Sequence, residues 1–157
     1  MNYLKTPSTT FLIFAIVAGA IGIFSVFVTW TYSDHLSTSG WELIQGAPFY
    51  VHSTLVPLSE ALGIYRWIPL LILVFSAVAL TLGVILSRTE RRGFGIGMTI
   101  SGILMVAVTV LFNKQDHGLF IEYAGDGEVF AVVAGVIIII LGIVRILFYE
   151  KPSCRSN

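Results

Sequence analysis

Four apolar runs constrain the fold of this chain more than any other feature: residues 11–30, 67–86, 94–112 and 129–148. Each run is 19 or 20 residues long, and Arg145 is the one charged residue within them. At about 1.5 Å per helical residue, a run of this length crosses the roughly 30 Å of hydrocarbon in a bilayer. Because lipid offers the backbone no hydrogen-bond partners, each run is predicted to form a transmembrane helix. The first run is long for a signal sequence, so we expect it to be retained.

The composition also indicates a membrane protein. Hydrophobic residues make up 56% of the chain and charged residues 11%, whereas a soluble domain carries about 25% charged residues. We therefore expect one membrane domain over residues 1–157, of the all-α class, with the four helices in a bundle. The single Cys154 excludes an intrachain disulfide. The few basic residues give no sign of a nucleic-acid partner.

The distribution of charge predicts the orientation of the chain, because Lys and Arg favour the cytoplasmic side. If both termini are cytoplasmic, the inner side holds seven basic residues: Lys5, Arg88, Arg91, Arg92, Arg145, Lys151 and Arg155. The outer side then holds two, Arg66 and Lys114. We expect a multi-pass protein of the cell membrane with cytoplasmic termini. Residues 87–93 would form the inner connector, and residues 31–66 and 113–128 the outer loops.

Small residues recur on one face of each predicted helix, where they allow close helix packing. The candidate packing residues are Gly19, Gly22, Gly83, Gly97, Gly102, Gly135 and Gly142. Such faces serve either packing within the chain, which we favour, or contact with another subunit. Serine and threonine within the runs are predicted to form hydrogen bonds between helices.

The central parts of the four runs contain no ionisable residue. Buried ionisable groups usually mark proton relays, ion pathways and voltage sensors, and broken half-helices mark many transporters. The sequence therefore argues against a proton pump or a secondary transporter. Arg145, one turn from the inner end of its run, is predicted to extend its guanidinium group to the lipid headgroups.

The two outer loops are predicted to form a small β-sheet that acts as a lid over the bundle. Residues 40–46, GWELIQG, read as one strand, residues 49–55, FYVHSTL, as a second, and residues 119–123, LFIEY, as a third. Residues 57–66 are predicted to form a short helix. Trp41 would anchor the lid, with Phe49 and Phe120 beside it over the outer mouth of the bundle. The candidate interaction residues are Trp41, Phe49, Phe120 and Tyr123.

Several outer residues have the chemistry of metal ligands: Asp34, His35, His52, Asp116, His117, Glu122, Asp126 and Glu128. Adjacent Asp-His pairs rarely bind one ion, however, and the spacing of known zinc motifs is absent. We therefore interpret these residues as solvated polar groups near the membrane. The chain also lacks a serine elbow, a phosphate-binding loop and a dinucleotide fingerprint. No catalytic residue, cofactor or metal is expected.

In topology the chain resembles the claudin-like tetraspan proteins. Trp30 closes the first run, and Gly40-Trp41 is similar to part of the tryptophan signature of that family. The paired loop cysteines of the family are absent. The resemblance implies four helices, cytoplasmic termini, an outer sheet drawn from both loops, and a role in adhesion, scaffolding or as an accessory subunit.

Together these features predict a non-enzymatic membrane protein. It would act as an accessory, scaffolding or self-associating subunit through its outer lid and small-residue helix faces. Its partners would be the lipid bilayer and other membrane-protein subunits or further copies of itself. Two alternatives stay open. One is an oligomeric channel or transport component whose negative outer face concentrates cations. The other is a metal-dependent membrane enzyme that uses the outer His, Asp and Glu residues.

Overall fold

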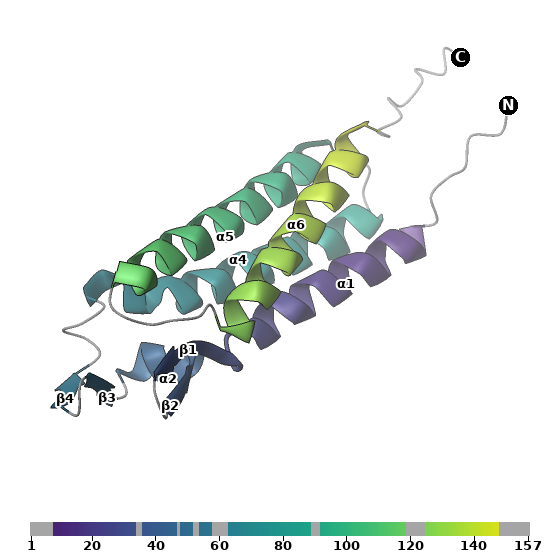
Figure 1. Cartoon of the computed structure of the whole chain (residues 1–157). Coiled ribbons are helices and arrows are strands. Elements are labelled where there is room, and N and C mark those ends of the chain that lie inside the picture. Colours follow the sequence, from purple (N-terminus) through teal and green to yellow (C-terminus); the bar gives the residue numbers. More distant parts are fainter. Residues whose placement is uncertain are drawn as a thin grey trace, which may run out of the picture.

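The computed structural model is mostly helical, and its long helices lie side by side (Figure 1). It describes residues 8–33, 36–46, 48–51, 54–57, 63–88, 92–118 and 125–147. The long helices are α1 (Ser8–Ser25), α4 (Ile68–Arg88), α5 (Arg92–Gly118) and α6 (Asp126–Leu147). The shorter elements are β1 (Thr29–Ser33), β2 (Leu36–Ser39), α2 (Gly40–Gln45), β3 (Pro48–Val51), β4 (Thr54–Pro57) and the 3-10 helix η1 (Gly63–Trp67).

Three of the helical segments are long and apolar enough to cross a membrane: Gly63–Leu86, Gly93–Lys114 and Asp126–Leu147. Their exposed surfaces are covered by valine, leucine and isoleucine rather than by charge, as lipid-facing surfaces are. The apolar helix Thr9–Ser25 is shorter. The three long helices agree with the expectation of a membrane protein.

Helices that are consecutive along the chain pack against each other, and the first helix also packs against the last. Helix α1 packs against α4 and α6, and α5 packs against the same two helices. Neighbouring helices are antiparallel, as short connections require. β1, β2 and α2 therefore lie at one end of the helices, and the start of α1 and the end of α6 lie at the other (Figure 1). We refer to the end that carries β1, β2 and α2 as the hairpin end.

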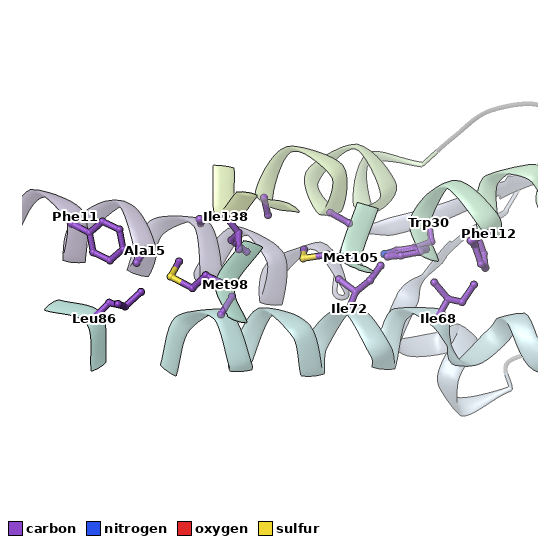
Figure 2. Close-up of a cluster of buried hydrophobic side chains, with 14 of the residues drawn as sticks. Phe11, Ala15, Trp30, Ile68, Ile72, Leu86, Met98, Met105, Phe112 and Ile138 are labelled. Carbon is purple, nitrogen blue, oxygen red and sulfur yellow. The ribbon is translucent and has the colours of Figure 1, made fainter. Parts of the chain in front are cut away.

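Buried side chains form a continuous line along the bundle (Figure 2). Phe11 and Leu86 lie at the end near the termini, Met98 and Met105 lie between, and Trp30 lies at the hairpin end. Flexible methionine side chains fill the irregular spaces that small residues leave between close helices. The buried hydroxyl groups of Ser76 and Thr109 donate to carbonyl oxygens of their own helix, at 2.7 and 2.8 Å. Ser76 Oγ also lies 3.6 Å from the Met105 Sδ of α5, within hydrogen-bond distance for sulfur. The predicted bond between helices is therefore present at Ser76, whereas the bond of Thr109 is to the preceding turn of its own helix.

The first helix ends at Ser25, five residues earlier than the apolar run predicts. The chain leaves it through a turn in which Val26 and Phe27 donate to carbonyls three residues before them, and then forms β1. The prediction of a helix through residue 30 is wrong because hydropathy does not distinguish a buried strand from the end of a helix. Trp30, apolar by composition, is the second residue of β1.

Two small antiparallel sheets follow, both between α1 and α4. β1 pairs with β2, and β3 pairs with β4. Residues 49–55 were predicted as one strand but contain parts of two, with Val51 opposite Thr54. Of the short helix predicted over residues 57–66, Pro57 instead ends strand β4 and residues 63–66 belong to the 3-10 helix η1; residues 58–62 lie outside the described residues. The strand predicted at residues 119–123 lies outside the described residues.

The strand predicted for residues 40–46 is wrong, because residues 40–45 form helix α2. Ser39 and Glu42 make a capping box, in which the Ser39 side chain accepts a hydrogen bond from the Glu42 backbone and the Glu42 side chain accepts one from the Ser39 backbone. This reciprocal pair satisfies two N–H groups at the start of a helix. Gly46 then ends α2 in the left-handed conformation, with φ of 75°, which glycine adopts without steric strain. Local hydrogen bonding therefore overrides the alternating polarity of these residues.

Candidate functional site at the hairpin end

Trp30 closes the hairpin end from the inside. Its side chain is completely buried, and its indole N–H donates to the Ser25 carbonyl oxygen at 2.7 Å. That carbonyl belongs to the last turn of α1, where helix carbonyls lack partners within the helix. The ring meets Phe112 of α5 edge-on, with the centroids 5.2 Å apart (Figure 2). Trp30 thus joins the end of α1 to the end of α5.

Three glycines let the backbone approach Trp30 closely. A Cβ atom at Gly40 would lie 2.8 Å from the indole Nε1, and one at Gly127 would collide with the same ring. A Cβ atom at Gly125 would collide with the backbone of Trp30, whose carbonyl oxygen accepts the Gly125 N–H at 3.1 Å. The start of α2 and the start of α6 are therefore both packed against this tryptophan.

Helix α2 is held firmly against the bundle. The Trp41 N–H donates to the Val26 carbonyl oxygen at 2.8 Å, and the Leu43 side chain is completely buried. Both the Ser39 backbone N–H and the Ser39 hydroxyl donate to the Glu42 carboxylate. These hydrogen bonds, of which the backbone bond has the larger effect, lower the pKa of Glu42 below its ordinary value of 4.5. Hydrogen bonds lower a carboxyl pKa because they stabilise the charged form. The exposed face of α2 is thus presented by a capped and anchored helix.

That exposed face carries an aromatic pair. Trp41 is 42% exposed and Phe27 is 53% exposed. Their rings stack with the centroids 5.8 Å apart and an interplanar angle of 30°. A second exposed pair, Phe24 of α1 and Phe130 of α6, has centroids 6.4 Å apart. The Phe27–Trp41 pair is therefore a fixed aromatic surface at the hairpin end.

The four predicted interaction residues have different outcomes. Trp41 was predicted to anchor the lid; its side chain is exposed and stacks on Phe27, whereas Trp30 is the buried tryptophan of this end. The role of Trp41 as an interaction residue stays a prediction. Phe49 belongs to β3, but its side chain is not described. Phe120 and Tyr123 lie outside the described residues. The sequence signal that identifies α2 is the Ser39-x-x-Glu42 capping box, which was missed.

The predicted packing glycines all lie at contacts between helices of this chain, where an added Cβ would meet atoms of the neighbouring helix. The contacts are α1 with α4 for Gly19, Gly22 and Gly83, α4 with α5 for Gly97, and α5 with α6 for Gly102, Gly135 and Gly142. These small-residue faces are therefore filled by the chain's own helices.

Glu128, predicted as a solvated outer residue, is buried instead. Its side chain is 3% exposed, in the first turn of α6. The Asn113 Nδ2 of α5 donates to its Oε2 at 2.9 Å, whereas Oε1 accepts no hydrogen bond from the described residues. Asn113 and Glu128 adjoin the ends of two predicted helices, so an antiparallel arrangement brings them to one level. The burial of Glu128 depends on how closely α5 and α6 pack.

A groove of about 330 Å³ lies beside this carboxyl group, between α5 and α6. We call it the α5–α6 groove; its lining includes Val110, Asn113, Glu128, Val129, Val132 and Val133. Its volume is near the lower limit of small-molecule sites, about 300 Å³. The groove combines an apolar surface with one buried acid.

The other polar candidates are placed as follows. Arg145, predicted to reach the headgroups, donates from Nη2 to the Leu86 carbonyl oxygen at 3.2 Å and lies over the Phe11 ring. A cation near the last carbonyls of α4 is favourable because that end of a helix is negative. The side chains of the three histidines are not described. Among the described residues, no group of three or more His, Cys, Asp or Glu side chains is arranged to hold a metal.

Comparison with known proteins finds no match to this chain among protein-family models, curated proteins or solved structures. The claudin-like resemblance therefore stays a prediction from the layout of the sequence.

Proposed function

We propose that this chain is a non-enzymatic membrane protein that acts as an accessory or scaffolding subunit by binding another membrane protein at its hairpin end. The observation that carries the proposal is the Phe27–Trp41 pair: the exposed Trp41 ring on the anchored helix α2 stacks on the exposed Phe27 ring of the turn after α1. Fixed aromatic side chains of this kind dominate binding energy at protein interfaces, because little side-chain entropy is lost when a partner covers them.

The proposal includes a particular placement in the membrane. All four long helices cross the bilayer, in the claudin-like layout, with the hairpin end outside and both termini in the cytoplasm. The support is the excess of Lys and Arg in the segments at the other end, which favours the cytoplasm. The hairpin elements then form an extracellular lid, and a partner would approach α2 from the outside or from the adjacent membrane.

The filled glycine faces narrow the choice of binding surface. In membranes, small-residue faces are the usual sites of helix association, but here they are used within the chain. The remaining helix surfaces carry mainly aliphatic side chains that match lipid tails, together with the exposed Phe24–Phe130 pair. The binding surface for a protein partner is therefore proposed at the hairpin end, where the exposed side chains lie on α2 and the adjoining turn instead of on the flank of a long helix.

Site-specific photo-crosslinking in native membranes tests the proposal. A photoreactive amino acid at position 41 is expected to give a discrete protein adduct, identified by mass spectrometry. The control is the same amino acid at Ile140, an exposed residue on α6, where lipid adducts alone are expected. Lipid adducts alone at both positions would refute a protein partner. Ion flux into liposomes, or metal bound to the purified protein, would point instead to a channel or to a metal-dependent enzyme.

A further inference from the structure

We propose that the α5–α6 groove binds a membrane lipid that carries a primary ammonium in its headgroup, with Glu128 as the group that recognises the ammonium. This inference does not depend on the proposed partner of the Phe27–Trp41 pair. It rests on the position of the carboxyl group, on its incomplete hydrogen bonding, and on the apolar surface next to it.

The groove opens on the flank of the helices that faces lipid. Val110 of α5, and Val129 and Val133 of α6, line it and are substantially exposed. A groove between two antiparallel membrane helices runs along the direction of the lipid tails. An acyl chain can therefore lie against these valines and keep its headgroup at the level of the helix ends, where Glu128 lies.

Glu128 has fewer hydrogen bonds than a buried carboxyl group requires. Asn113 donates to Oε2, and Oε1 has no donor among the described residues. The Gly125 N–H lies near the carboxyl group, but its hydrogen bond in regular geometry is to the Trp30 carbonyl oxygen. A buried polar atom without a partner is unfavourable. A ligand that supplies an N–H donor would remove this deficit.

The position of the carboxyl group in its helix favours a cation over a neutral donor. Glu128 lies in the first turn of α6, where the helix dipole stabilises negative charge. A hydrogen bond between an ammonium and a carboxylate is about twice as strong as one between neutral groups. A primary ammonium offers three N–H donors, whereas a quaternary ammonium such as that of choline offers none. The site should therefore discriminate between the headgroups of phosphatidylethanolamine and phosphatidylcholine, which carry the same charge.

The experiment compares the two lipids directly. The full-length protein is placed in nanodiscs that contain equal amounts of phosphatidylethanolamine and phosphatidylcholine with the same acyl chains. Lipids retained after gentle release from the nanodisc are counted by native mass spectrometry. We expect phosphatidylethanolamine to be enriched about tenfold, the ratio that corresponds to one 1.4 kcal/mol difference in binding. Equal retention of the two lipids would overturn the proposal.

Three variants locate the selectivity. Glu128→Gln keeps the shape of the side chain but removes its charge, and should reduce the enrichment to below about twofold. Val133→Phe should do the same by filling the groove without touching the carboxyl group. Val136→Phe is the matched control, one turn along α6, equally exposed at 43% against 44% but outside the groove lining, and should retain the enrichment.

Each combination of results decides the question. Enrichment that survives Val133→Phe, or that is lost equally in Val136→Phe, would show that the lipid binds elsewhere. Enrichment that survives Glu128→Gln would show that the groove holds the acyl chain without recognition by the carboxyl group. If Glu128→Gln does not fold, the Val133→Phe and Val136→Phe pair still tests the position of the site.

Discussion

Replacement of Trp30 by phenylalanine tests how the hairpin end is held together. The substitution keeps an aromatic ring against Phe112 but removes the indole N–H that reaches the Ser25 carbonyl oxygen. The carbonyl lies in a buried environment, so loss of its donor leaves it without that hydrogen bond.

The expected loss of stability can be worked out from these contacts. A buried carbonyl without its hydrogen bond costs about 1–3 kcal/mol, so Trp30→Phe should lower the free energy of unfolding by about that amount. Trp30→Ala removes the ring as well and should cost about 3–5 kcal/mol. The aromatic contact with Phe112 contributes about 0.5–1.5 kcal/mol of the difference between the two variants.

Equilibrium unfolding in mixed micelles with an increasing fraction of dodecyl sulfate, followed by circular dichroism, measures these changes. The control is Trp41→Phe, which makes the same substitution at an exposed tryptophan and should change stability by less than about 0.5 kcal/mol. If Trp30→Phe and Trp41→Phe unfold at the same dodecyl sulfate fraction, Trp30 is not the residue that joins α1 to α5.

Two further predictions concern packing and capping. Gly102→Ala should lower the free energy of unfolding by about 1–3 kcal/mol, because the new Cβ would lie 2.7 Å from a backbone oxygen of α6. The control Gly97→Ala, whose Cβ would meet only the Leu82 side chain, should change the free energy of unfolding by less than about 0.5 kcal/mol. Equal losses for the two variants in the same unfolding assay would contradict this prediction. Ser39→Ala should destabilise α2 by about 1 kcal/mol, measured as faster hydrogen exchange of the Glu42 amide. Because hydrogen bonds from Ser39 lower the pKa of Glu42, their stabilisation is complete above pH 4.5 and is lost as the pH falls below it. A carbon-13 NMR titration should show the Glu42 pKa rising in Ser39→Ala, and an unchanged midpoint would refute the capping argument.

The capping box shows how far local sequence could be interpreted. Ser39 and Glu42 have the spacing of a helix start, and Gly46 has the position of a helix end, so α2 was predictable from three residues. The strand prediction followed the alternation of Trp41 and its neighbours instead. Over so short a segment, the hydrogen bonds at its ends decide its conformation more strongly than its periodicity.

The burial of Glu128 and Trp30 was less accessible from sequence. Glu128 looks like any acid at the end of a membrane helix until Asn113 of the antiparallel neighbour lies beside it. Trp30 looks like an interfacial aromatic until Gly40, Gly125 and Gly127 allow two backbone segments, the start of α2 and the start of α6, to close around it. Both outcomes depend on contacts between residues far apart in the chain.

The sequence by itself determined that the chain contains long apolar helices and where most of them lie, because a backbone in hydrocarbon must satisfy its own hydrogen bonds. The tertiary structure alone decided which tryptophan is buried, which acid is enclosed and which glycine faces are filled. Hydropathy depends on each residue separately, whereas these properties depend on the distances between helices, and those distances are set by the packing of side chains from every part of the bundle.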